Sequence, residues 1–177
     1  NGFLLNSLKM VLDFIEKDEI QMIHYPDFFE EGYKHKYDKD IYHYLDNVAR
    51  NNQYEMNRGF SHRLLRCSCV IWQFKNLDEL KAKYNEVINV LENSYDGEVN
   101  TPDVQRLKGM IREFEEELVW AYNGVLVNNV HHLHLGFYQD KGITKGPNMQ
   151  RDVMPILNQF RKIQPDIISV TLDPEGS

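Results

Sequence analysis

The hydrophobic pattern of this sequence changes period near residue 130, and that change constrains the fold more than any other feature. Before it, apolar residues recur at steps of three and four, as they do on one face of an α-helix. From Val130 to Phe137 the pattern alternates, which is typical of a β-strand. A helical pattern returns from Arg151 to Ile163, and the apolar, β-branched stretch "IISVTL" follows at residues 167–172. The alternation of helix and strand predicts an α/β fold. Because the last strand is almost entirely apolar, we expect it to be a parallel strand covered on both faces.

The chain before residue 130 contains five helical patterns. Two of them begin at clear capping signals, because Asn76 is followed three residues later by Glu79, and Thr101 is followed by Pro102. The third pattern includes the run "CSCVIWQF", which is also compatible with a strand, although the high apolar density on every side from Phe60 to Phe74 favours a buried helix. The predicted helices cover residues 3–16, about 40–49, 60–74, 77–95 and 102–123.

Composition limits the class of protein. The 177 residues match one domain, and 42% hydrophobic residues are enough to bury a core. With 20 basic and 27 acidic residues the net charge is −7, and no dense basic cluster predicts binding to nucleic acid. No apolar run approaches the roughly 20 residues that a membrane span needs. Two cysteines and the lack of a secretory leader predict a cytoplasmic protein, although the start at Asn1 without a methionine suggests a fragment.

Three histidines in "VHHLHLGFYQ" raise the question of a metal site. In a strand, His132 and His134 would share one face, where two imidazoles can bind one zinc ion. Zinc would need a third ligand, and the sequence spacing shows none. The alternative is that the two histidines mark the wetter face of a strand whose other face is apolar. His131 would lie on that apolar face, as a hydrogen-bonded histidine at the start of the strand.

Several motifs resemble the deacetylase-type domain of the PIG-L or LmbE-like family, in the form that some bacteria fuse to a glucosamine-6-phosphate deaminase. The resemblance lies in "DGEVNTPDVQRLKGMIREFEEE", "VHHLHLGFYQDKGITKGP" and "QPDIISVTLDP", and it covers residues 77–177. It implies a three-layer α/β fold with a parallel sheet, formed by an incomplete single domain over residues 1–177. In that arrangement residues 76–177 form the deacetylase-like part, and residues 1–75 form a helical or irregular insertion.

The family uses zinc to remove acetyl groups from N-acetylated amino sugars, so the resemblance implies zinc and an amino-sugar substrate for a larger parent protein. Its metal motifs are incomplete here. No His-Pro-Asp-Asp string occurs in this chain, and Glu175 stands where relatives often have histidine after the Asp173-Pro174 pair. We therefore expect no catalytic residue and no bound zinc in this segment, with Asp173 and Glu175 near the rim of the active site.

Two residues are candidates for substrate binding. The resemblance places Arg112 at the rim of a sugar pocket, where a planar guanidinium can bind hydroxyl groups or a phosphate. The alternative is a surface ion pair between Arg112 and Glu115, three residues apart on one helix. His131 is the other candidate, because it matches a position that relatives tend to keep.

Three hypotheses about function follow. The first is a fragment of a zinc-dependent N-deacetylase-like domain, linked in its parent to glucosamine-6-phosphate deaminase or isomerase activity and inactive by itself. The second is a non-catalytic domain that has lost its metal site and serves assembly or regulation. The third is a small zinc protein built on His132 and His134. Apolar faces left exposed by missing segments would also favour self-association into a homo-oligomer.

Overall fold

Helix α3 (Gln53–Trp72) lies at the centre of the first part of the chain and contacts the four other long helices there. The computed structural model describes residues 2–25, 27–32, 37–95, 97–135 and 148–170, with the backbone alone at residues 31, 32, 37 and 38. It divides into two compact units, residues 1–130 and 131–177. The predicted boundary between residues 75 and 76 lies inside the first unit, just after α3.

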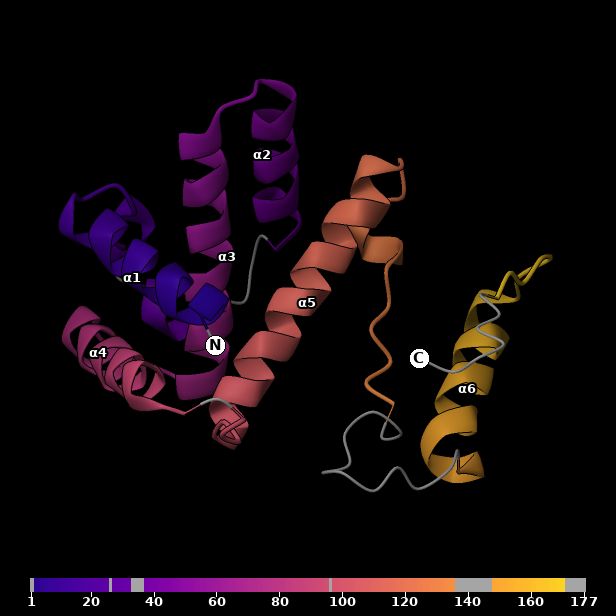
Figure 1. The fold of residues 1–177 in the computed structure, drawn as a ribbon. Helices are drawn as coiled ribbons and strands as arrows, with labels where there is room; N and C mark the ends of the chain where they lie inside the picture. The colour runs from indigo at the N-terminus through magenta and orange to yellow at the C-terminus, as the bar shows by residue number, and fades with distance from the viewer. Residues whose placement is uncertain (1, 26, 33–36, 96, 136–147, 171–177) are drawn as a thin grey trace. The chain divides into compact units, whose positions relative to one another are not determined.

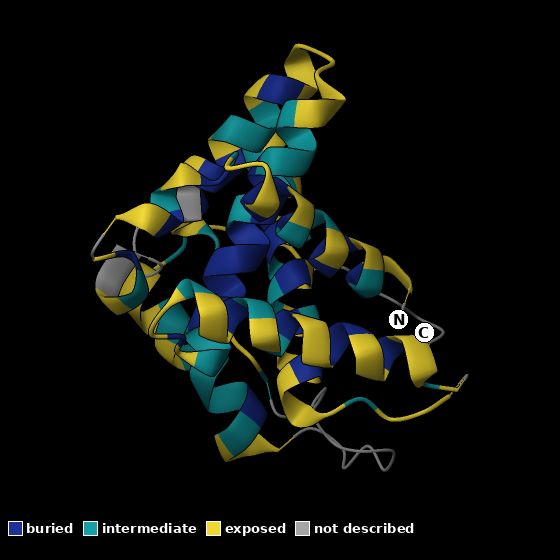
Figure 2. Ribbon diagram, turned by 90° about the vertical axis from the view of Figure 1, so that its left-hand side faces the viewer, coloured by how far each residue is buried: buried dark blue, intermediate teal, exposed yellow. Residues whose placement is uncertain are grey.

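The first unit is helical. On one side of α3 lie α1 (Gly2–Glu16) and α4 (Leu77–Asn93), which also pack on each other, and on the other side lie α2 (Tyr37–Ala49) and α5 (Pro102–Tyr122) (Figure 1). Three short helical turns complete it, namely η1 (Gln21–His24), η2 (Phe28–Gly32) and η3 (Val127–Asn129). Figure 2 shows buried residues where the helices face one another and exposed residues on their outer faces. The five predicted helices are confirmed, with boundaries that differ by up to seven residues, most at the start of α3.

Local capping explains where the central helices begin. The side chain of Asn76 accepts a hydrogen bond from the Glu79 amide at 2.9 Å, while Glu79 accepts one from the Lys75 amide at 2.9 Å. Thr101 likewise caps α5, and Pro102 occupies its first turn. Such caps satisfy amide groups that have no partner inside the helix. The capping signals in the sequence therefore fix the starts of α4 and α5 correctly.

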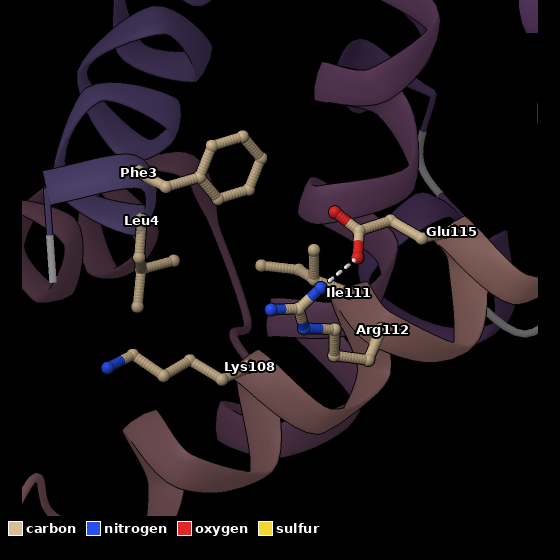
Figure 3. Close-up of a pocket in the computed structure, with 6 residues that line it drawn as sticks. All are labelled: Phe3, Leu4, Lys108, Ile111, Arg112 and Glu115. Carbon is tan, nitrogen blue, oxygen red and sulfur yellow. Dashed lines mark hydrogen bonds and ion pairs between the residues drawn. The ribbon is translucent and has the colours of Figure 1, made fainter.

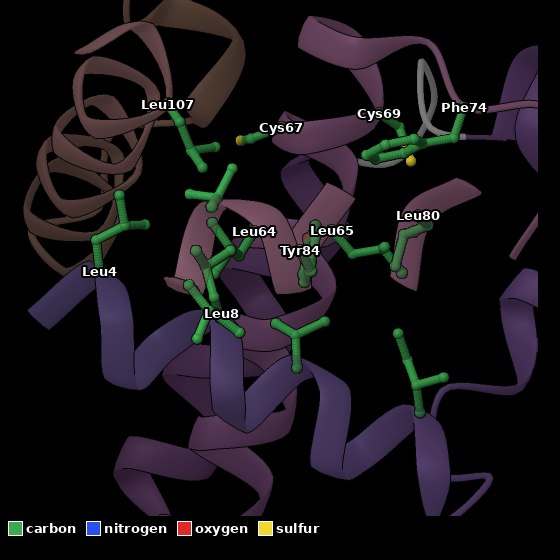
Figure 4. Close-up of a cluster of buried hydrophobic side chains, with 14 of the residues drawn as sticks. Leu4, Leu8, Leu64, Leu65, Cys67, Cys69, Phe74, Leu80, Tyr84 and Leu107 are labelled. Atoms are coloured by element: carbon green, nitrogen blue, oxygen red, sulfur yellow. The ribbon is translucent and has the colours of Figure 1, made fainter. Parts of the chain in front are cut away.

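The hydrophobic core joins α1, α3, α4 and α5 (Figure 4). Leu8 and Leu65 are fully buried, and Tyr84 is buried with its hydroxyl 2.7 Å from Ser68 Oγ. Cys67 and Cys69 are free thiols inside this core. Burial raises the pKa of Cys67 to about 11, so the thiol stays protonated at neutral pH.

Two buried ion pairs connect α3 to α5 and α2. Arg63 Nη2 lies 2.5 Å from Glu117 Oε2 of α5, and Arg66 Nε lies 2.7 Å from Asp40 Oδ2 of α2. We call these four residues the buried charge seam. Burial raises the pKa of Asp40, although the neighbouring Arg66 acts in the opposite direction. Removing one partner of such a pair leaves a buried charge without its counter-charge, so the seam favours this particular arrangement of helices.

The predicted parallel sheet is wrong, because none of the residues in the described ranges forms a β-strand. Residues 130–135 are an irregular connection, and His134 has a positive φ of 48°, which a strand does not accommodate. Ile167, Ile168 and Val170 are also irregular and are exposed rather than covered on two faces. The three-layer α/β architecture is therefore not the fold of this chain.

The described residues of the second unit include one longer helix. A single π-helical turn, η5 (Met149–Val153), leads directly into α6 (Met154–Ile163), so the helix predicted for residues 151–163 is confirmed. Asn148 starts this segment, since its side chain accepts hydrogen bonds from the amides of Gln150 and Arg151. None of the described helices in either unit is long and apolar enough to cross a membrane.

Candidate functional site

A pocket opens between the start of α1 and the middle of α5 (Figure 3). Its volume is about 440 Å³, within the usual range for small-molecule sites. The inner face of α5 is packed in the core, so the side chains on its flank project toward α1. We call this cavity the α1–α5 pocket. Its lining residues are Phe3, Leu4, Lys108, Ile111, Arg112 and Glu115.

The polar groups of the α1–α5 pocket come from successive turns of α5. Lys108 and Arg112 are four residues apart and therefore lie on the same face of the helix. Arg112 Nη1 donates a hydrogen bond to Glu115 Oε2 at 2.9 Å. Partial burial lowers the pKa of the Lys108 ammonium below its usual value. The pocket thus combines two basic side chains and one carboxylate.

The apolar groups of the pocket come mainly from α1. In Figure 3 the ring of Phe3 and the side chain of Leu4 face the basic side chains across the cavity. Phe3 is 61% exposed, so its ring is accessible to a ligand. An apolar wall opposite a few charged groups is the usual composition of a site for a small polar molecule.

A second cavity, of about 310 Å³, lies next to the first and shares Phe3 and Glu115 with it. We call it the aromatic compartment. Gln53 and Asn57 lie at its α3 edge, and Gln53 Nε2 donates a hydrogen bond to Asn57 Oδ1 at 2.8 Å. The other lining residues are Ser7, Met10, Tyr44, Phe60, Phe114 and Leu118.

The structure places the predicted site residues in different parts of the chain. Arg112 makes the predicted surface ion pair with Glu115 and also lines the α1–α5 pocket, while its predicted role in binding a sugar stays a prediction. His131 belongs to the second unit, where it is exposed. Asp173 and Glu175 lie outside the described residues, and their predicted place near an active-site rim stays a prediction.

Among the described residues, the possible zinc site of His132 and His134 has no third ligand. The rings of His132 and His134 have centroids 6.5 Å apart, at an interplanar angle of 71°. Within the described ranges, no group of three or more His, Cys, Asp or Glu side chains is placed to hold one metal ion. Zinc sites in proteins use at least three such ligands. These residues therefore do not fit a zinc site by themselves, and we derive no catalytic step through zinc from them; the metal interpretation of the pair stays a prediction.

Sequence reasoning missed two residues of the α1–α5 pocket. Lys108 was detectable in principle, because it precedes Arg112 by four residues on a helix that was predicted correctly. Phe3 gave no such signal, since it is more than one hundred residues away in sequence. Its role depends on the tertiary packing of α1.

The chain is similar in sequence to a known bacterial protein. The chain is 34% identical over 109 residues, 59% of its length, to a glucosamine-6-phosphate deaminase-like protein of Bacteroides thetaiotaomicron. The match covers 16% of that protein, so the chain spans a small part of this relative. No protein-family model and no solved structure matches the chain. The comparisons confirm the deaminase-like part of the resemblance and give no support to its PIG-L or LmbE-like part.

Proposed function

We propose that this chain is part of a protein of amino-sugar metabolism and that its α1–α5 pocket binds a phosphorylated amino sugar. The observation that carries the proposal is the placement of Lys108 and Arg112 beside Glu115 and opposite Phe3 in one pocket. The named relative supports the class of ligand, because glucosamine 6-phosphate carries both a phosphate and an amino group.

Each chemical group of such a ligand has a counterpart in the pocket. The phosphate would bind Lys108 and Arg112, and a guanidinium matches phosphate geometry with two parallel hydrogen bonds. The ammonium group would pair with the Glu115 carboxylate. The apolar face of the sugar ring would pack on Phe3, which is exposed enough to be covered.

The proposed role is binding. It therefore agrees with the hypothesis of a non-catalytic domain that serves assembly or regulation in a larger protein. The zinc-dependent deacetylase activity, which the resemblance implied for the parent, is not included, because no observation on the described residues favours it.

Isothermal titration calorimetry of the 177-residue chain with glucosamine 6-phosphate tests the proposal. We expect saturable binding that weakens with added salt, because exposed charges are screened. Glucosamine, which lacks the phosphate, should bind more weakly. Arg112→Gln should lower the affinity about tenfold, the effect of losing one charge-assisted hydrogen bond.

Arg106→Gln is the matched control, since it removes the same charge from an exposed position of α5 that does not line the pocket. Its affinity should equal that of the unmodified chain. The absence of binding, or equal losses in the two variants, would refute the proposed site.

A further inference from the structure

The aromatic compartment has the composition of a sugar-binding surface. Three aromatic pairs lie along it, with ring centroids 5.7 Å apart for Phe3 and Phe60, 5.8 Å for Phe60 and Phe114, and 5.9 Å for Tyr44 and Phe114. Such rings offer apolar area to the C–H face of a sugar with little loss of side-chain freedom. Phe114 is buried beneath the compartment, so the accessible rings are those of its half-buried and exposed neighbours.

Polar recognition in this compartment comes from the first turns of α3. Gln53 is exposed and Asn57 is half-buried, and their mutual hydrogen bond orients both amides. That bond uses one amide hydrogen of Gln53 and the carbonyl oxygen of Asn57. The Gln53 Oε1 atom and the Asn57 Nδ2 atom are thereby presented as an acceptor and a donor for hydroxyl groups.

The two cavities are neighbours rather than separate sites. Phe3 and Glu115 line both of them, so a ligand that fills the α1–α5 pocket reaches the edge of the aromatic compartment at these two residues. The two compartments differ in chemistry. The α1–α5 pocket contains the basic side chains, whereas the described lining of the aromatic compartment contains none.

We infer that the ligand of this site is an amino-sugar disaccharide with a phosphate on one ring, and that its second, unphosphorylated ring lies in the aromatic compartment. The inference rests on the proposed function, because the α1–α5 pocket must first hold the phosphorylated ring. The glycosidic bond would pass Phe3, and the second ring would lie against Phe60 and Tyr44 with hydroxyls bonded to Gln53 and Asn57.

The test compares two ligands on the full chain by calorimetry, glucosamine 6-phosphate and a glucosamine disaccharide carrying one 6-phosphate. We expect the disaccharide to bind about tenfold more tightly, since each added hydrogen bond and its apolar contact stabilise the complex. The double variant Gln53→Ala, Asn57→Ala should abolish this gain and leave the affinity for the monosaccharide unchanged. Arg112→Gln should weaken the binding of both ligands.

A matched control is Asn85→Ala, which removes an amide from an exposed position of α4 outside both cavities. It should leave both affinities unchanged, and circular dichroism of each variant verifies that the helices have formed. If the monosaccharide binds through Arg112 but the disaccharide gains nothing, the inference is wrong and the proposed function stands. If neither ligand binds, both are wrong. A gain that survives the double variant would also overturn the inference.

Discussion

His62 should make the first unit lose stability as the pH falls below neutrality. It lies on α3, half-buried, with its ring stacked on His43 at a centroid distance of 6.5 Å. Its buried Nε2 atom has no hydrogen-bond partner among the described residues. Burial, with smaller contributions from Arg58, Arg66 and His43, lowers the pKa of His62 from 6.5 to about 4. The folded protein therefore binds this proton less readily than the unfolded chain does.

The sign and size of the effect follow from this difference. Above pH 6.5 the neutral imidazole is present in both states, and its contribution to stability is complete. As the pH falls toward 4, the unfolded chain binds the proton while the folded protein does not, so the free energy of unfolding decreases. At about 1.36 kcal/mol for each pH unit, the loss between pH 7 and pH 4.5 is about 2 to 3 kcal/mol.

Urea unfolding at pH 7 and pH 4.5, followed by circular dichroism, measures this loss. In His62→Gln the loss should be about 2 to 3 kcal/mol smaller than in the unmodified chain. Asp40, whose pKa is raised, gives a contribution that falls as the pH rises, but both proteins retain it and it cancels in the comparison. His131→Gln is the control, because His131 is exposed and lies outside the first unit, so the loss should be the same as in the unmodified chain. An identical loss in His62→Gln and the unmodified chain would refute the argument.

Two further substitutions test the interior of the first unit, each by the midpoint of urea unfolding at pH 7. Glu117→Gln removes the counter-charge of Arg63 from the buried charge seam and should destabilise the fold by about 3 kcal/mol; a loss below about 1 kcal/mol would show that water reaches the pair. Tyr84→Phe should cost only about 1 kcal/mol. Ser68 Oγ keeps its own hydrogen bond to the Leu65 carbonyl at 2.8 Å, so the variant loses one hydrogen bond without leaving a donor unsatisfied, and a loss of several kcal/mol would contradict this assignment.

The helices were predictable because the information that specifies them is local. A cap such as Asn76, and the recurrence of apolar residues at steps of three and four, act within a few turns of one helix. In the longest helices of the first unit, the caps and the apolar spacing both favour a helix over other secondary structure. Their ends were less certain, since α3 begins at Gln53, seven residues before the predicted start at Phe60. The residues from Gln53 to Gly59 are mostly polar, so no apolar pattern marks the beginning of the helix.

The strands were not predictable from the same kind of pattern. The alternation of apolar and polar residues at 130–135 predicts which side chains a strand would place on each of its faces. A strand forms, however, only if another segment pairs with it. His134 adopts a positive φ instead, and Ile167 is 83% exposed. The predicted fold class was therefore wrong because a strand needs a partner segment, which a local pattern does not reveal. A helix forms its hydrogen bonds within itself and can be predicted locally.

The site shows the same division between local and tertiary information. The pair of Arg112 and Glu115 was found from spacing along α5, whereas Phe3 joined it only through the packing of α1. Both walls of the α1–α5 pocket depend on buried residues, because Leu4 and Ile111 line the pocket and also belong to the core. The core therefore holds Phe3 opposite the basic side chains, and a ligand that bridges α1 and α5 would stabilise the same packing that forms its binding site.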